Sequence, residues 1–304
     1  MEISAVIPTR NRMKDLSECL NSILSQSLLP GEVIIVDDGS LDDEFLEEYR
    51  EKLGSAGVGF LYLKKRSPGL AASRNLAAGK ASGEFILILD DDVVLGKGFI
   101  RALYEICLEN KEEKEFGGAG GVVSNYRRRH PLERFYRRLF RITSYHSWDI
   151  TSAGFQVWDD SLKERETAYY LHGGLSMYRR DLLLESPFRN LSPGRTSGGD
   201  PDFFMRAKNK GYRFIIEPGA KAVHKLSPLS RDRQYARGVK EGHNQYIIFR
   251  DNADRTFENW ALFIWSNTGW VLRQIPAGRP VRAAGMVTGL VKAAFLEGKK
   301  LIRN

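Results

Sequence analysis

Cysteine is scarce in this chain of 304 residues, and the scarcity bears on where the protein works. The two cysteines, Cys19 and Cys107, are far apart and match no metal-binding or redox spacing, which argues against a disulfide-stapled secreted fold. The sequence also lacks a basic segment followed by a short apolar run at its start, so we expect no signal peptide. We therefore expect a cytoplasmic protein, either in solution or at the cytoplasmic face of a membrane.

Long hydrophobic runs are also absent. The sequence has no uninterrupted apolar stretch of about 18 residues, the length that a spanning helix needs. Its nearest candidates, residues 260–272 and 283–296, are broken by polar side chains. Segments of this kind are typical of core helices or of helices that lie in a membrane interface.

Two common phosphate-binding loops are missing. No G-x-G-x-x-G follows the first apolar run, which excludes a dinucleotide-binding fingerprint. No G-x-x-x-x-G-K-[ST] is present, which excludes a P-loop nucleotide triphosphatase. Any nucleotide must therefore be bound by other means.

The charge balance is basic. The chain has 46 Lys and Arg against 38 Asp and Glu, a formal charge of +8, which favours anionic partners. Seven arginines interleaved with aromatic residues lie within residues 126–141 and predict a basic helix. Such a helix suits a lipid-phosphate surface, a phosphorylated acceptor or nucleic acid, and a merely solvated face is the alternative. We assign it no catalytic role and do not expect nucleic acid as the partner.

Strands and helices alternate over the first 90 residues. Short apolar runs predict buried strands at residues 3–7, 33–36, 60–63 and 84–89, with Pro8 ending the first. Helical patterns lie between them, at residues 15–27, 40–52 and 69–79. This alternation predicts a doubly wound, parallel α/β sheet.

Acidic residues directly follow two of these strands. Asp37 and Asp38 come after the second strand, and Asp90, Asp91 and Asp92 come after the fourth. The carboxyl ends of parallel strands meet at one edge of the sheet, where open α/β folds bind ligands. Because neighbouring carboxylates repel one another, a divalent cation and a phosphate-bearing ligand are expected there. From this motif alone, an acidic turn with Asp92 as a helix cap is the alternative.

Four motifs follow one another in the order and spacing of a known family. They are Val6-Ile7-Pro8-Thr9-Arg10-Asn11-Arg12, Val36-Asp37-Asp38-Gly39-Ser40, Ser73-Arg74-Asn75-Leu76-Ala77 with Ala81-Ser82-Gly83-Glu84, and Leu89-Asp90-Asp91-Asp92. The series closely resembles the family 2 glycosyltransferases of GT-A fold. This resemblance implies a Rossmann-like, mostly parallel sheet, a nucleotide diphosphate sugar donor, a divalent metal (Mn²⁺ or Mg²⁺) and inversion at the anomeric carbon.

The resemblance also implies roles for individual residues. Asp38 would hold the nucleoside, with Arg74 and Asn75 supporting its pocket. Asp92 would bind the metal and His224 would complete the metal shell, although a structural role for His224 is the alternative. The other residues expected to contact the nucleotide sugar are Pro8, Thr9, Arg10, Arg12, Asp90 (near the ribose) and Asp91.

The general base is expected at Asp200. The family usually has Glu-Asp at this position, followed by a helix with a later arginine, and here Gly199 replaces the glutamate. Asp202 is the alternative base, or it pairs with Arg206 one turn later. Asp200 preceding a proline would also suit a helix N-cap. His172, in the Tyr170-Leu171-His172-Gly173-Gly174 segment, is expected to be structural.

These expectations define the predicted protein. Residues 1–225 form the GT-A domain, with a nucleotide-binding half at 1–95 and an acceptor half at 96–225. Residues 226–304 form a helical C-terminal extension whose aromatic part packs on the catalytic domain, makes a homodimer or lies at a membrane interface. The Gln-x-x-Arg-Trp signature of processive synthases is missing, so we expect a non-processive enzyme that glycosylates a hydroxyl of a lipid-linked or cell-surface glycan precursor.

Two other functions fit the sequence less closely. One is a sugar-phosphate nucleotidyltransferase, although that class normally has a glycine-rich loop after its first strand, where this chain has Pro8-Thr9-Arg10-Asn11-Arg12. The other is a membrane-associated protein that binds nucleotide sugars without catalysis.

Overall fold

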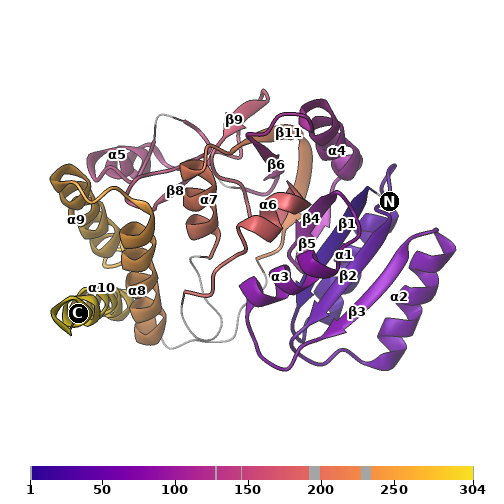
Figure 1. The fold of residues 1–304 in the computed structure, drawn as a ribbon, viewed down its shortest axis with the longest axis horizontal. Helices are drawn as coiled ribbons and strands as arrows, with labels where there is room; N and C mark the ends of the chain where they lie inside the picture. The colour runs from indigo at the N-terminus through magenta and orange to yellow at the C-terminus, as the bar shows by residue number, and fades with distance from the viewer. Residues whose placement is uncertain (1, 127–128, 145, 192–198, 227–233, 304) are drawn as a thin grey trace.

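The computed structural model describes residues 2–126, 129–144, 146–191, 199–226 and 234–303 (Figure 1). A nine-stranded sheet occupies one end and the centre of the molecule, and three long C-terminal helices stand at the other end. This arrangement confirms the predicted α/β fold with a helical C-terminal region.

The strand order of the sheet is β3-β2-β1-β4-β10-β6-β11-β5, with β9 paired to β11. The strand bounds are Ile3–Thr9 (β1), Glu32–Asp37 (β2), Gly59–Lys64 (β3), Phe85–Leu89 (β4), Val93–Leu95 (β5), Phe116–Val123 (β6), Glu166–Ala168 (β9), Leu175–Arg179 (β10) and Arg213–His224 (β11). The first four strands pair in parallel, whereas β10 runs antiparallel to both β4 and β6. A separate pair, β7 (Asp149–Ile150) and β8 (Gln156–Val157), forms a small second sheet.

The first strand is longer than the sequence predicts, because β1 continues through Pro8 to Thr9. Its pairing with β4 ends at Val6, whereas its pairing with β2 continues to the end of the strand. The missing N–H of Pro8 therefore lies where one neighbouring strand is no longer paired, which is a position that proline tolerates. The extra residues carry Thr9 to the edge of the sheet.

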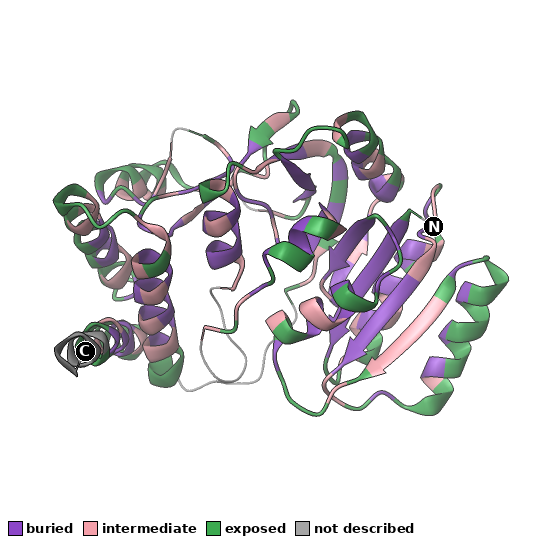
Figure 2. Cartoon of the chain, in the orientation of Figure 1, coloured by how far each residue is buried: buried purple, intermediate pink, exposed green. Residues whose placement is uncertain are grey.

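Helices cover both faces of the sheet. The helices α1 (Met13–Leu24), α2 (Asp43–Ser55) and α4 (Phe99–Asn110) pack on one face, and α3 (Leu70–Lys80), α6 (Arg180–Glu185) and α7 (Gly199–Asn209) pack on the other. Alternate residues of a strand pack into different cores: Leu87 and Leu89 pack into one, and Ile86 and Ile88 pack into the other. Figure 2 shows β1, β2 and β4 buried along almost their whole length, whereas the edge strand β3 is mostly half-buried.

The C-terminal helices are α8 (Gln234–Asn252), α9 (Phe257–Leu272) and α10 (Pro280–Arg303). They build a third core with α5 (Pro131–Leu139) around Tyr246, Phe249 and Phe263. The basic helix is thus shorter than the predicted segment 126–141, and Arg127 and Arg128 lie outside the described residues. Among the described residues, no helix is both long and apolar enough to span a membrane.

α8 and α10 cross in close contact because each has two glycines four residues apart. Gly238 and Gly242 lie on α8, and Gly285 and Gly289 lie on α10. A Cβ added at any of the four would lie between 2.0 and 2.3 Å from a backbone oxygen of the other helix. Packing of this kind lets two backbones approach more closely than larger side chains allow.

Candidate active site

The carboxyl ends of β1 and β4 bring the first and fourth sequence motifs together. Thr9 Oγ1 donates a hydrogen bond of 2.8 Å to Asp91, and Arg12 Nη1 donates one of 2.9 Å to the other oxygen of the same carboxylate. Burial raises the pKa of Asp91, and the nearby Arg12 and Thr9 oppose that rise. Asp91 therefore ties the two strand ends together from inside the protein.

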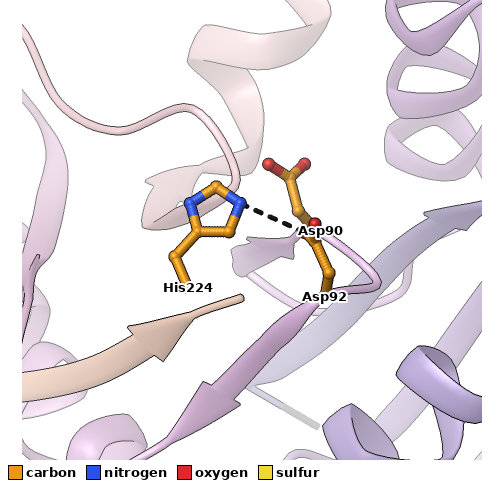
Figure 3. A group of neighbouring side chains, drawn as sticks. All are labelled: Asp90, Asp92 and His224. Carbon is orange, nitrogen blue, oxygen red and sulfur yellow. Dashed lines mark hydrogen bonds and ion pairs between the residues drawn. The ribbon is translucent and has the colours of Figure 1, made fainter. Parts of the chain in front are cut away.

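Three side chains at this edge form a candidate metal site. Oxygen atoms of Asp90 and Asp92 and a ring nitrogen of His224 all lie within 4.8 Å of one another (Figure 3). His224 ends β11, whose antiparallel pairing with Val93 of β5 places it beside the acidic motif. Two carboxylates and one imidazole are ligands that Mn²⁺ accepts in proteins. The sequence paired only Asp92 with His224, and the structure brings Asp90 into the same group.

His224 is held toward the acids by electrostatics. Its Nε2 lies 3.1 Å from Asp92 Oδ1. Burial alone would lower the pKa of His224, but the carboxylates of Asp92 and Asp90 outweigh burial and raise it above its ordinary value. A divalent cation would take the place of that proton, because only the neutral imidazole binds metal.

The two acids at the carboxyl end of β2 have different environments, since Asp37 is its last residue and Asp38 follows it. Asp37 is fully buried and accepts hydrogen bonds from Tyr62, Lys64 and two backbone amides, and these contacts hold its pKa below the ordinary value against the effect of burial. Asp38 is only partly buried and accepts a hydrogen bond of 2.9 Å from the Gly69 amide. Its other neighbours are Arg10 at 3.9 Å and Lys65 at 3.7 Å. Of the two, Asp38 is the more accessible to a ligand.

Arg74 links the metal group to the expected base. Its guanidinium is 2% exposed and donates to Asp200 Oδ1 at 2.6 Å and to Asp90 Oδ1 at 3.3 Å. The ring of Phe188 lies beneath it, with 5.1 Å between the guanidinium carbon and the ring centroid. Both carboxylates remain partly exposed, so one buried cation orients two carboxylates that come from distant parts of the chain.

Two adjacent glycines make room for those carboxylates. A Cβ on Gly173 would lie 2.5 Å from the carboxyl carbon of Asp200, and a Cβ on Gly174 would lie 2.1 Å from that of Asp90. The Asp90 amide also donates to the Gly174 carbonyl at 2.9 Å. Glycine is required here because any larger side chain would displace an acid.

Asp202 has a different environment from Asp200. It is fully buried and its carboxylate pairs with Arg189 and, at 3.0 Å, with Arg206. Asn252 of α8 donates a further hydrogen bond of 3.2 Å. The predicted Asp202–Arg206 pair is present, and these contacts leave Asp200 as the better placed of the two candidate bases.

Asn75 and His172 lie near the site with structural contacts. The Asn75 side chain donates to the Phe188 carbonyl at 2.8 Å and accepts from the Phe188 amide at 3.0 Å. It thereby holds the segment that places Phe188 under Arg74. His172 packs against Trp148 and has its Nε2 3.1 Å from Asp160 Oδ1.

A pocket of about 400 Å³ opens beside Asp200. Its lining includes Arg74, Asp200 and Tyr170, together with side chains from α8 and α9. The residues from these helices are Glu241, Asn244, Gln245, Ile248 and Trp270. The pocket is large enough for a sugar-sized group and offers both an indole ring and polar side chains.

Sequence reasoning missed three parts of this site. Lys65 could have been expected, because a basic pair follows the third strand. The Gly173-Gly174 pair was visible as a motif, but its purpose depends on acids that are distant in the sequence. The wall from α8 and α9 had no local signal, since it exists only through the packing of the C-terminal helices.

Comparison with solved structures gives the class of fold. The mannosyltransferase PcManGT from Pyrobaculum calidifontis, solved in complex with GDP-Man and Mn²⁺, aligns over 99% of this chain and 79% of its own. The TM-score is 0.56 and the sequence identity is 18%. The protein therefore has a GT-A fold, the class that its sheet and strand-end acids indicate.

The sequence comparison gives the family. Residues 4–185 match the family described as "Glycosyl transferase family 2", and the chain belongs to that family. One relative, "Uncharacterized glycosyltransferase YwdF" of Bacillus subtilis (strain 168), is 29% identical over 81% of this chain and 82% of its own length. Another, the "Poly(ribitol-phosphate) beta-glucosyltransferase" of Bacillus spizizenii, is 34% identical over 40% of this chain but only 20% of its own length.

Proposed function

We propose that this protein is a non-processive, inverting glycosyltransferase that moves a sugar from a nucleotide diphosphate sugar to an acceptor hydroxyl. The observation that carries the proposal is the Arg74 bridge, which joins Asp90 of the candidate metal group to Asp200 of the neighbouring pocket. Transfer of a sugar needs a donor site next to an acceptor site. The buried Arg74 guanidinium contacts a carboxylate of each proposed site, which supports this arrangement.

The donor side comprises the strand-end residues. Asp38 would hold the nucleoside, with Arg10 and Lys65 nearby, and Asp90, Asp92 and His224 would hold Mn²⁺ or Mg²⁺. The metal, when bound, neutralises the diphosphate of the leaving nucleotide. Thr9 acts through Asp91, Arg12 through Asp91 and, at 3.3 Å, Asp92, and Asn75 through Phe188.

The acceptor side is the pocket beside Asp200. Asp200 would take the proton from the acceptor hydroxyl as that oxygen attacks the anomeric carbon from the face opposite the leaving diphosphate. Arg74 fixes the direction of the Asp200 carboxylate, and Gly173 leaves the space that it occupies. The name of the Bacillus spizizenii relative supports a hydroxyl of a polyol phosphate or a related glycan precursor as the acceptor class. Attachment of that acceptor to a lipid and a cytoplasmic location stay predictions.

The domain boundary at residue 225 is also a proposal. It does not separate the site from the C-terminal helices. Because α8 and α9 form a wall of the pocket that contains Asp200, residues 226–304 belong to the proposed acceptor site as well as to an extension. Truncation at residue 225 would remove that wall.

Replacement of Asp200 tests the proposal. In the Asp200→Asn variant we expect sugar transfer, and the slower transfer to water, to fall by about 10²- to 10⁴-fold because the general base is lost. Binding of the nucleotide sugar with Mn²⁺, measured by calorimetry, should change little. Release of nucleoside diphosphate from UDP-GlcNAc, UDP-Glc and GDP-Man is the readout, since it needs no identified acceptor.

A variant outside the site provides the control for Asp200→Asn. Asp254→Asn changes an exposed acid on the loop after α8 and should keep full turnover. Normal turnover by Asp200→Asn would show that another group is the base. Formation of pyrophosphate from a nucleoside triphosphate and a sugar phosphate would instead favour the nucleotidyltransferase.

A further inference from the structure

Exposed apolar side chains gather at one end of the molecule. Of the twenty large apolar side chains that are exposed among the described residues, ten lie between residues 257 and 296, on or between α9 and α10. Three more, Leu132, Phe135 and Leu139, lie on α5. Phe257 is 87% exposed, and Ile264 and Phe295 are each 62% exposed. A soluble surface rarely concentrates apolar groups in this way without a partner.

The exposed residues form stripes along the helices. Phe257, Ile264 and Leu272 recur along α9 at helical spacing, and Val287, Val291 and Phe295 recur every four residues along α10. An almost wholly apolar groove of about 430 Å³ lies between the two stripes, and its lining includes Ile264, Leu272, Val287 and Val291. The stripes therefore border one continuous face.

α5 extends this face. Trp265 of α9 stacks on Phe140, at 4.9 Å between ring centroids, and its indole donates to the Leu139 carbonyl at 2.7 Å. Arg273 of α9 pairs with Glu133 of α5 at 2.9 Å. We call the exposed surface of α5, α9 and α10 the apolar–basic face, because Arg134, Arg138, Arg279 and Lys292 are exposed on the same three helices or the turn between two of them.

The charge of this end is strongly positive. Residues 226–304 contain thirteen Lys and Arg against six Asp and Glu, so they carry +7 of the chain's formal charge of +8. Residues 126–141 add seven arginines against one glutamate. The rest of the chain is therefore net acidic, so the formal positive charge comes from the two sequence segments that also contain these exposed apolar side chains.

We propose that the apolar–basic face docks on the surface of a bilayer that contains anionic phospholipids. Apolar stripes flanked by Arg and Lys match the acyl boundary and the charged headgroups of such a bilayer, and the absence of a spanning helix among the described residues fits attachment to the surface. A second copy of the chain fits less well, because a two-fold interface would place these like charges against one another. Docking would hold the pocket beside Asp200 close to the bilayer, since α8 and α9 line that pocket. The apolar–basic face lies outside the proposed catalytic residues, and its binding to vesicles can be measured without transfer activity.

Vesicle flotation tests the proposal. The full chain should float with phosphatidylcholine vesicles that contain phosphatidylglycerol, and far less with phosphatidylcholine alone. The triple variant Ile264→Ser, Val291→Ser, Phe295→Ser should bind at least about tenfold more weakly, because each change removes apolar surface that the bilayer would bury. Each of Arg134→Gln and Arg138→Gln should weaken binding roughly fivefold at low salt.

A matched control separates this result from a general loss of apolar surface. Leu108 on α4 and Leu184 on α6 are 40% and 48% exposed and lie outside the face, so Leu108→Ser, Leu184→Ser should bind vesicles like the unaltered chain. Unchanged thermal unfolding and donor binding by the triple variant would show that it is folded. The proposal would be overturned if the unaltered chain did not float, or if the triple variant bound vesicles equally well. It would also be overturned if the unaltered chain sedimented as a dimer and the triple variant lost the dimer but still bound vesicles.

Discussion

The two ends of the molecule are stabilised in different ways. In the sheet region, residues 1–225, 33 Lys and Arg nearly balance 32 Asp and Glu, and aliphatic and aromatic residues fill a core on each face of the strands. In residues 226–304 the charge is +7, and α8 and α10 contact through glycines and backbone atoms. Of the twenty large apolar side chains that are exposed among the described residues, twelve lie in residues 226–304, although that segment is only about a quarter of the chain.

This difference indicates what each end contributes to the site. Strand ends fix Asp38, Asp90, Asp92 and His224 because sheet pairing determines where each strand stops. The wall from α8 is placed by its contact with α10 and by the pairing of Glu241 with Arg282 at 2.6 Å. A change in helix packing should therefore alter the acceptor side and spare the donor side.

The largest effect on stability is expected from Gly242→Ala. Its Cβ would lie 2.0 Å from the Met286 carbonyl oxygen, so α8 and α10 would have to separate. We expect a loss of about 3 kcal/mol, at the upper end for overpacking, measured by urea unfolding. The variant should still bind the nucleotide sugar if the sheet folds independently of the helical end.

Gly79→Ala is the matched control. Gly79 lies in α3, and an added Cβ would have no neighbour within 4 Å. Alanine there should stabilise the chain by about 0.5–1 kcal/mol, as it does in an open helical position. If both variants lost the same stability, close contact between α8 and α10 would not hold the helical end together.

A smaller loss is expected from Asp37→Asn in the sheet region. Asp37 is fully buried and hydrogen-bonded, so the variant should lose about 2 kcal/mol at neutral pH. Because the folded-state pKa of Asp37 is lowered, its stabilisation is complete above the unfolded-state pKa and is lost as the pH falls through the folded-state pKa. The gap between the two proteins in urea unfolding should therefore shrink below about pH 4. A gap that stays constant with pH would exclude this charge as the cause.

Local pattern predicted much of the sheet region. Short continuous apolar runs located the first four strands, and the acids after two of them located the edge where the site lies. Local pattern could not show that Asp37 is buried and hydrogen-bonded while Asp38 is accessible, because this difference depends on Tyr62 and Lys64 of the neighbouring strand. The extension of β1 through Pro8 likewise depends on where pairing with β4 ends.

The helical end was less predictable for the same physical reason. Its helices are present, but α5, which packs against them, begins only at Pro131, and Arg137 is half-buried while Arg134 and Arg138 remain exposed. Burial and neighbouring positive charges lower the pKa of Arg137 to about 10. Contacts of α5 with α9 and β8 decide which of its arginines are solvated, and the spacing of residues along a helix does not reveal such contacts.

The smallest predicted effects, and the ones that most sharply separate the two sides of the site, come from the adjacent glycines. Neither Gly173 nor Gly174 has a positive φ, so alanine at either position acts only through its Cβ. Gly174→Ala displaces Asp90 and should weaken Mn²⁺-dependent nucleotide binding about tenfold, roughly the energy of one hydrogen bond. Gly173→Ala displaces Asp200 and should lower turnover by a similar factor with nucleotide binding nearly unchanged. Calorimetry and nucleoside diphosphate release on the two variants would reveal this crossed pattern, whereas equal losses in both measurements would mean that the two carboxylates move as one unit through Arg74.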